Sequence, residues 1–230
     1  MNWRPESPLD TVYVWVLRRP QRSRTGARQV LAEVGARVLG ANPGQVEVSQ
    51  DSAGQPVLRS PSGRLWVSLS YGPEVLALAA SLAGPVGIDI EGARPAAVTR
   101  LADRWFDAAG AQWVREQQAA EQLRAFLLLW TAKEALGKAL GTGLRGSGLR
   151  RVVPLPPVTD GSFQPVPGGL RLAHPALGED LVLAVATGPG AGGVSTVVVE
   201  RELGHLRLAR STARSRTSLP VVVRGNGSRT

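Results

Sequence analysis

The chain contains no cysteine among its 230 residues, so it can form neither a disulfide framework nor a thiolate metal site. Its only histidines, His174 and His205, lie far apart in the sequence and offer no His/Cys set for zinc. The longest apolar run, residues 75–88, is interrupted by Gly84 and Pro85 and is too short to span a bilayer. The first ten residues have acids and prolines where a signal peptide needs a cationic start and an apolar stretch. We therefore expect a cytoplasmic protein with no membrane contact.

Lysine is nearly absent as well. Of the 27 basic residues only two are lysine, and both Lys133 and Lys138 lie in the segment FLLLWTAKEALGKALGTGL. GC-rich codon usage would explain arginine almost everywhere, but it would not explain two lysines five residues apart. An ammonium group is a compact charge that can reach a phosphate, whereas a guanidinium group is a broad, flat fork. Chance clustering is the alternative, but the segment is a candidate for chemistry that needs lysine.

Positive charge is concentrated near the C-terminal end. The formal net charge is +9, and residues 201–230 contribute +6 of it through seven arginines against one acid. The rest of the chain is only mildly basic and lacks a basic stripe with interleaved aromatics, since aromatic residues make up 5% of the sequence. We therefore expect no nucleic-acid partner, and we interpret residues 207–230 as a basic, disordered tail.

Hydrophobic periodicity predicts an α+β protein. Strands are expected at residues 11–17, 46–49, 65–70, 75–81, 86–91, 170–173, 181–186 and 195–200, and helices at 25–39, 97–104, 108–118 and 120–140. Each half of the chain thus combines helices with antiparallel-looking strands, which suggests two lobes of comparable size. We divide the chain into an N-terminal lobe (1–92), a C-terminal lobe (93–206) and the tail (207–230), and expect the active site in the cleft between the lobes.

Two carboxylates stand close together in the predicted strand VGIDIEG. Residues two apart in a strand point to one face, so Asp89 and Glu91 should lie side by side while Ile88 and Ile90 point to the other face. Like charges held together repel each other unless a cation or a shared proton relieves them. Two solvated acids at an exposed strand end are the simpler alternative for this pair taken alone.

The long predicted helix adds a third carboxylate. Trp130, Glu134 and Lys138 follow one another at steps of four and therefore form one stripe, which a Gly-Thr-Gly exit follows. A helix-stabilising ion pair between Glu134 and Lys138 would explain these two residues alone, but not their combination with the acidic pair and the second lysine. Oxygen ligands suit Mg²⁺, which keeps water and substrate phosphates in its coordination shell. The pattern predicts a magnesium site for pyrophosphate-cleaving transfer chemistry.

These motifs resemble the signature of the Sfp-type 4′-phosphopantetheinyl transferases. The run GIDIE at 87–91 is followed about 40 residues later by WTAKEA at 130–135 and by Lys138, and upstream GQP at 54–56 and VSLS at 67–70 stand in the family order. The resemblance implies two pseudo-twofold-related α+β lobes. It also implies transfer of the phosphopantetheine group of coenzyme A to a serine of an acyl or peptidyl carrier protein, with release of 3′,5′-ADP.

The resemblance also implies roles for individual residues. Asp89, Glu91 and Glu134 would ligate Mg²⁺ together with the coenzyme A pyrophosphate, and Glu91 or Glu134 would accept the proton of the carrier serine. Lys138 would steady the phosphates, with Lys133 nearby.

Further contacts to the nucleotide would come from the first half of the chain. Arg28 and Ser70 would approach the 3′-phosphate, next to Tyr71, which could donate a hydrogen bond to phosphate. Tyr71 stands where the family commonly has histidine, and Gln55 stands where it usually has a basic residue, so two cations are missing near the nucleotide. These departures leave open a catalytically weakened relative that binds coenzyme A or a carrier protein without efficient turnover. Because two related lobes in one chain have no need to oligomerise, we expect a monomer.

Overall fold

The computed structural model describes residues 11–18, 24–52, 54–93, 97–145, 148–178, 180–189, 193–199 and 221–223. The strands are β1 (Thr11–Arg18), β2 (Glu47–Gln50), β3 (Pro56–Ser60), β4 (Gly63–Gly72), β5 (Val75–Ser81), β6 (Val86–Gly92), β7 (Gln164–Val166), β8 (Leu170–Ala173), β9 (Leu181–Thr187), β10 (Gly193–Val199) and β11 (Val221–Val223). The helices are α1 (Arg24–Leu39), α2 (Val98–Trp105), α3 (Ala108–Glu116) and α4 (Gln122–Ala139), with short 3-10 helices η1 (Pro43–Gln45) and η2 (Gly148–Arg150).

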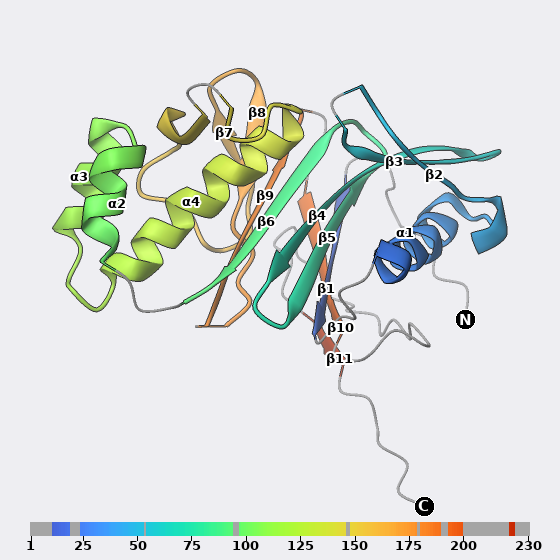
Figure 1. The fold of residues 1–230 in the computed structure, drawn as a ribbon, viewed down its shortest axis with the longest axis horizontal. Helices are drawn as coiled ribbons and strands as arrows, with labels where there is room; N and C mark the ends of the chain where they lie inside the picture. The colour runs from blue at the N-terminus through green and yellow to red at the C-terminus, as the bar shows by residue number, and fades with distance from the viewer. Residues whose placement is uncertain are drawn as a thin grey trace, which may run out of the picture.

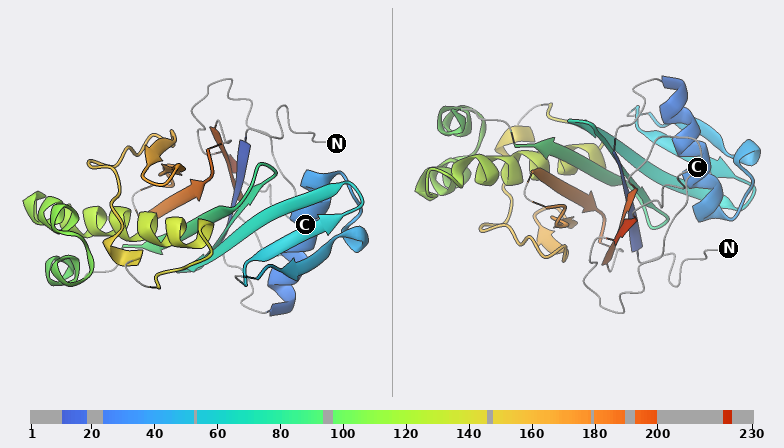
Figure 2. Two further views of the ribbon diagram at one scale, coloured as in Figure 1. Left: turned by 90° about the horizontal axis from the view of Figure 1, so that it is seen from above. Right: turned by 90° about the horizontal axis from the view of Figure 1, so that it is seen from below.

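The strands form two sheets that pack against each other, with helices on their outer sides. One sheet has the order β11-β10-β1-β5-β4-β3-β2 and the other the order β6-β9-β8-β7. Helix α1 covers the first sheet, and α2, α3 and α4 gather over the second, at the opposite end of the molecule (Figures 1 and 2). The predicted α+β class is confirmed.

Alternation along the strands divides the apolar residues among three cores. In β1, Val12, Val14 and Val16 enter the core between the two sheets. Their neighbours Tyr13 and Trp15 point the opposite way, into the core beneath α1. Strands β5 and β9 are buried along their whole length, which is why their sequences read as unbroken apolar runs rather than alternating ones.

Besides β11, which lies in the tail, the strands β3 and β7 have no counterpart in the prediction from sequence. Strand β3 begins at Pro56, and Pro61 follows it directly, so prolines on both sides weaken the strand signal of this segment. Proline is nevertheless tolerated at the first residue of a strand, where its missing N–H costs little. Pairing with β4 and β2 then holds β3 in the sheet.

The two sheets do not divide at residue 92, where we placed the boundary between the lobes. Strand β6, assigned to the N-terminal lobe, pairs with β9 of the second sheet. Strand β10, assigned to the C-terminal lobe, runs parallel to β1 in the first sheet, from Thr11 opposite Gly193 to Leu17 opposite Val199. Without β10, one edge of the buried strand β1 would present unpaired backbone groups. The division into two lobes with a cleft between them stays a prediction.

The tail is described only in part. Residues 221–223, which we expected to be disordered, form β11 and pair in parallel with β10. The other tail residues, and His205, lie outside the described residues. No helix in the described part of the chain is both long and apolar enough to cross a membrane.

Helix α4 crosses β6 at Gly87, and this close crossing positions the candidate site. A Cβ atom at Gly87 would stand 1.9 Å from the Ala135 carbonyl oxygen and 2.6 Å from the Ala139 nitrogen. Only glycine therefore allows the helix backbone to lie directly on the strand at this point. The crossing holds Glu134 and Lys138 against the face of β6 that carries the acidic pair.

We expect Gly87→Ala to lower the free energy of unfolding by about 1–3 kcal/mol, because the added methyl group must push α4 away from β6. Urea denaturation of the purified chain measures this change. Gly188→Ala is the matched control, since a Cβ atom there meets nothing within 4 Å. Equal urea midpoints for the two variants would contradict the close crossing.

Candidate active site

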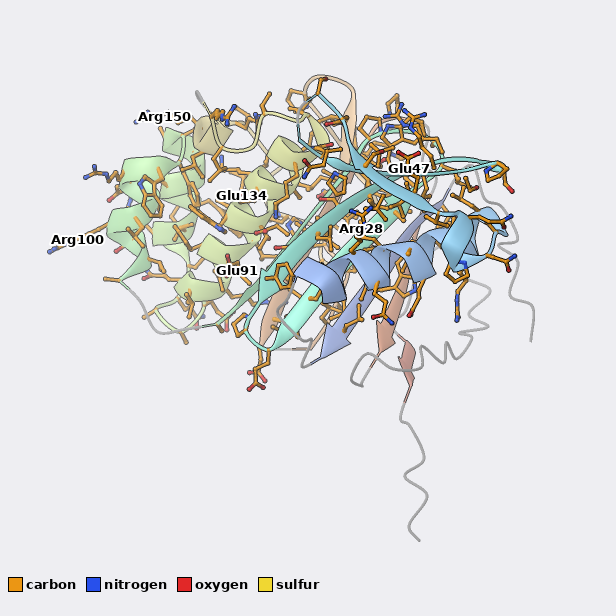
Figure 3. The ribbon with its side chains drawn as sticks, turned by 45° about the vertical axis from the view of Figure 1, so that its right-hand side comes forward. Arg28, Glu47, Glu91, Arg100, Glu134 and Arg150 are labelled. Atoms are coloured by element: carbon orange, nitrogen blue, oxygen red, sulfur yellow. The ribbon has the colours of Figure 1, made fainter. Side chains whose placement is uncertain are left out.

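The acidic pair lies on one face of β6, as the strand periodicity predicts, and α4 crosses that face. Ile88 and Ile90 lie in the core between the sheets, so the alternate residues Asp89 and Glu91 lie on the opposite face of β6. Figure 3 shows Glu91 and Glu134 on neighbouring elements, the strand β6 and the helix α4 that crosses it. The structure thus brings carboxylates from two distant sequence motifs into one region.

Asp89 is held by two side chains from different elements. Its side chain is buried, and its Oδ1 accepts hydrogen bonds from Ser70 Oγ at 2.7 Å and from Lys138 Nζ at 2.8 Å. Lys138 Nζ also donates to the Ile88 carbonyl oxygen at 2.9 Å. The second carboxylate oxygen of Asp89, Oδ2, is buried and has no hydrogen-bond partner among the described residues. A buried carboxylate oxygen without a donor is costly unless a cation or another donor reaches it.

Burial and the charges of Asp89, Lys138 and Glu91 all act on Glu134. Burial raises the pKa of Glu134 above its ordinary value, and the negative charges of Asp89 and Glu91 raise it further. The positive charge of Lys138 lowers this pKa, but by less than the charge of Asp89 raises it. A divalent cation would relieve the repulsion. The carboxylates are therefore close enough in space to act on one another, although they come from positions up to 45 residues apart in the sequence.

The residues of the site fit a hard divalent cation. Three carboxylates supply oxygen ligands only, which is the donor set that Mg²⁺ prefers, and the unpartnered Oδ2 of Asp89 provides a ligand atom that nothing else occupies among the described residues. Among the described residues, no three acidic or histidine side chains are grouped so that they could hold a metal ion by themselves. A Mg²⁺ site that is completed by substrate phosphates and water needs fewer protein ligands.

Lys133 does not lie in this cluster, contrary to the prediction that it stands near the phosphates. It is fully buried on another face of α4, where Nζ donates to Asp107 Oδ1 at 2.9 Å and to the Arg151 carbonyl oxygen. The ammonium group also lies 5.1 Å from the centroid of the Phe106 ring. One residue along a helix is a rotation of about 100°, so Lys133 cannot share the stripe of Glu134.

Asp107 and Arg151 are structural residues that the sequence analysis did not single out. Asp107 caps α3 by accepting the Gly110 N–H, and Arg151 Nη2 donates to Thr142 Oγ1 at 2.8 Å. Burial raises the pKa of Asp107, but the hydrogen bond and charge of Lys133, together with the backbone hydrogen bond from Gly110, hold that pKa below its ordinary value. Aspartate directly before a predicted helix is an N-cap signal, which could have identified Asp107 from the sequence.

The predicted nucleotide contacts lie on the first sheet and α1. Arg28 is exposed on α1, and Tyr71 is 43% exposed at the end of β4. Ser70 is different, because it is buried and its hydroxyl already donates to Asp89. In this arrangement Ser70 has no hydrogen left to donate to a phosphate. Gln55 lies in the turn before β3, where its N–H donates to Asp51.

His174 takes no part in the site. It is buried, its Nε2 lies 3.1 Å from the Leu128 carbonyl oxygen of α4, and burial lowers its pKa to about 4. A histidine that stays neutral in a core is a packing residue.

A family model for the 4′-phosphopantetheinyl transferase superfamily matches residues 85–185, which run from just before β6 into β9 and include Asp89, Glu91, Glu134 and Lys138. The chain is 32% identical to the 4′-phosphopantetheinyl transferase HetI of Nostoc sp. over 127 residues, 54% of either chain. It is 36% identical to the 4′-phosphopantetheinyl transferase AcpT of Salmonella typhimurium over 96 residues, 41% of this chain and 50% of the relative. A putative 4′-phosphopantetheinyl transferase of Synechocystis sp. is 31% identical over 125 residues, 52% of this chain and 49% of the relative.

These matches place residues 85–185 of the chain in the 4′-phosphopantetheinyl transferase superfamily.

The matched stretches span about half the length of these curated relatives. The superfamily match falls on the second sheet and the helices that cover it, and it begins just before the acidic pair. Arg28, Ser70 and Tyr71 precede it in the sequence, so the predicted nucleotide contacts depend on residues outside the part that the superfamily model matches.

Proposed function

We propose that this chain transfers the 4′-phosphopantetheine group of coenzyme A to a serine of an acyl or peptidyl carrier protein in a Mg²⁺-dependent reaction that releases 3′,5′-ADP. The observation that carries the proposal is the buried Asp89 carboxylate, with one oxygen held by Ser70 and Lys138 and the other without a partner among the described residues, in a group of three acids within the superfamily match. We also propose that the chain acts as a monomer in the cytoplasm.

In this proposal Asp89, Glu91 and Glu134 hold Mg²⁺ together with the coenzyme A pyrophosphate. When bound, the ion neutralises negative charge on the pyrophosphate as the leaving group departs. Lys138 uses two of its three N–H donors for Ile88 and Asp89, which leaves one for a phosphate oxygen. Both Asp89 and Lys138 are held in place by contacts that exist before the substrate arrives, so little reorganisation is needed during the reaction.

The proton of the carrier serine needs an acceptor as its oxygen attacks. The serine oxygen forms a bond to the β-phosphorus of coenzyme A, and the bond from that phosphorus to the bridging oxygen breaks, so that 3′,5′-ADP leaves. Glu134 is the stronger candidate for the base on electrostatic grounds, because burial and the neighbouring carboxylates raise its pKa and so increase its basicity. Glu91 is the second candidate, since it lies close enough for its charge to act on Glu134.

The proposal is tested by incubating the purified chain with coenzyme A, Mg²⁺ and a panel of apo carrier proteins, and reading the intact mass of each carrier. We expect one carrier at least to gain a single phosphopantetheine, the gain to disappear with EDTA, and excess Mg²⁺ to restore it. If no carrier gains mass although the chain binds coenzyme A in a separate titration, the result would instead support a catalytically weakened relative. Tyr71 and Gln55 would then be the first residues to test as the cause.

A further inference from the structure

The free edge of β6 is held by serine side chains of the other sheet. Among the described residues, β6 is the edge strand of its sheet and pairs with β9 on one side only. On the other side the N–H groups of Ile88 and Ile90 donate to Ser68 Oγ at 3.2 Å and to Ser70 Oγ at 3.3 Å. Both serines are buried and lie two residues apart on β4, so they point the same way. Two hydroxyl groups thus replace part of a β-ladder between the sheets.

The two serines differ in what their own hydrogens do. A serine hydroxyl can accept from a backbone N–H and still donate its single hydrogen. Ser70 donates that hydrogen to Asp89 Oδ1 at 2.7 Å, the short distance of a hydrogen bond to a charged acceptor. Ser68, by contrast, accepts from the N–H of Ile88, which lies two residues before Ile90 on β6. The residue before Ile88 is a glycine, so this position has no counterpart of Asp89. The pair therefore offers one serine that supports the strand edge and one that also contacts the candidate site.

The bond from Ser70 determines which oxygen of Asp89 remains available. Oδ1 receives hydrogens from both Ser70 and Lys138, while Oδ2 is buried and receives none among the described residues. Ser70 comes from one sheet and Lys138 from the helix above the other, so the carboxylate is held from two directions. A carboxylate fixed in this way cannot rotate to exchange its oxygens without breaking both bonds.

We propose that Ser70 is a positioning residue that orients Asp89 Oδ2 toward a bound divalent cation. This inference rests on the proposed function for the identity of the cation site, and it replaces the expectation that Ser70 approaches a phosphate. Hydrogen-bond partners that orient a metal-binding side chain typically change metal affinity by about 10–100-fold when they are removed.

The test is a titration of the full-length chain with Mn²⁺, followed by the electron paramagnetic resonance signal of the free ion. Mn²⁺ is the probe because it takes the same carboxylate and water ligands as Mg²⁺. We expect Ser70→Ala to raise the Mn²⁺ dissociation constant about 10–100-fold. Ser70→Thr, which keeps a hydroxyl group, should restore most of the affinity.

Ser68→Ala is the matched control. Both alanine variants lose one bond to the edge of β6, so both should lower the urea midpoint. Ser70→Ala should lower it further because it also loses the bond to Asp89, and only Ser70→Ala should weaken Mn²⁺ binding. A Ser70→Ala chain that binds Mn²⁺ as tightly as the wild type, or a Ser68→Ala chain that binds as poorly as Ser70→Ala, would overturn the inference, and so would a wild-type chain that binds no Mn²⁺.

The outcomes also separate this inference from the proposed function. If carriers gain phosphopantetheine but Ser70→Ala keeps the wild-type Mn²⁺ affinity, the transfer reaction stands and the positioning role fails. If Ser70→Ala weakens Mn²⁺ binding but no carrier gains mass, the positioning role stands and the transfer reaction fails.

Discussion

Replacing Asp89 with asparagine is expected to lower kcat/KM for carrier modification by about 10²–10³-fold. Ser70 and Lys138 both donate to Oδ1, so the new amide would have to place its carbonyl oxygen at that position. Its NH₂ group would then occupy the position of Oδ2, and a hydrogen-bond donor would face the cation in place of a ligand atom. The substitution therefore removes a ligand without changing the shape of the side chain.

The same substitution should also change the pH dependence. The negative charge of Asp89 raises the pKa of Glu134, so its removal should lower that pKa and move the acid limb of the remaining activity to lower pH. Asp103→Asn is the matched control, because Asp103 is an exposed acid on α2 that pairs with Arg115. Rates come from the intact-mass assay at several carrier concentrations. An Asp89→Asn rate within about tenfold of the Asp103→Asn rate would place the chemistry elsewhere.

Replacing Lys133 with methionine should be the most destabilising of the proposed substitutions, at about 3–5 kcal/mol of unfolding free energy. Methionine fills a similar volume, but it leaves the Asp107 carboxylate and the Arg151 carbonyl oxygen without their shared donor. Because the Asp107 side chain is 23% exposed and can be partly rehydrated, we expect the lower end of this range.

The exposed pair of Arg115 and Asp103 again provides the comparison. Arg115→Met removes one partner of an ion pair whose side chains are 48% and 49% exposed, so it should cost at most about 1 kcal/mol. Urea denaturation of both variants measures the two costs. If Lys133→Met were as stable as Arg115→Met but inactive in the transfer assay, Lys133 would be a functional residue after all, as the sequence analysis supposed.

The two lysines show where prediction from the sequence succeeded and where it failed. Their isolation among arginines indicated that each does something an arginine cannot, and helix periodicity placed Lys138 on the stripe of Glu134. Lys138 does contact the acidic strand. Lys133 serves the core instead, because the face of α4 that it occupies is covered by the segment around Arg151 and by the start of α3. Nothing in the local sequence states which face a later segment will cover.

Strand β6 likewise has one feature that the sequence predicted and one that it did not. Its period of two placed Asp89 and Glu91 on one face and the isoleucines on the other. The partners of the strand were not predictable in this way. The serines of β4 reach its free edge because the two sheets stack there, although the contact joins residues 20 positions apart that belong to different sheets.

By itself, then, the sequence determined the α+β class, the positions of most helices and strands, the faces on which the carboxylates and Lys138 lie, and the resemblance to a superfamily. Only the tertiary structure decided that β6 pairs in the second sheet and β10 in the first. It also decided that Ser70 holds Asp89 and that Lys133 is buried against Asp107. The physical reason is that backbone periodicity is local, since it follows from the geometry of a few consecutive residues. Which element covers a given face depends on the packing of the whole chain, and side chains such as Ser70 and Lys133 take their roles from that packing.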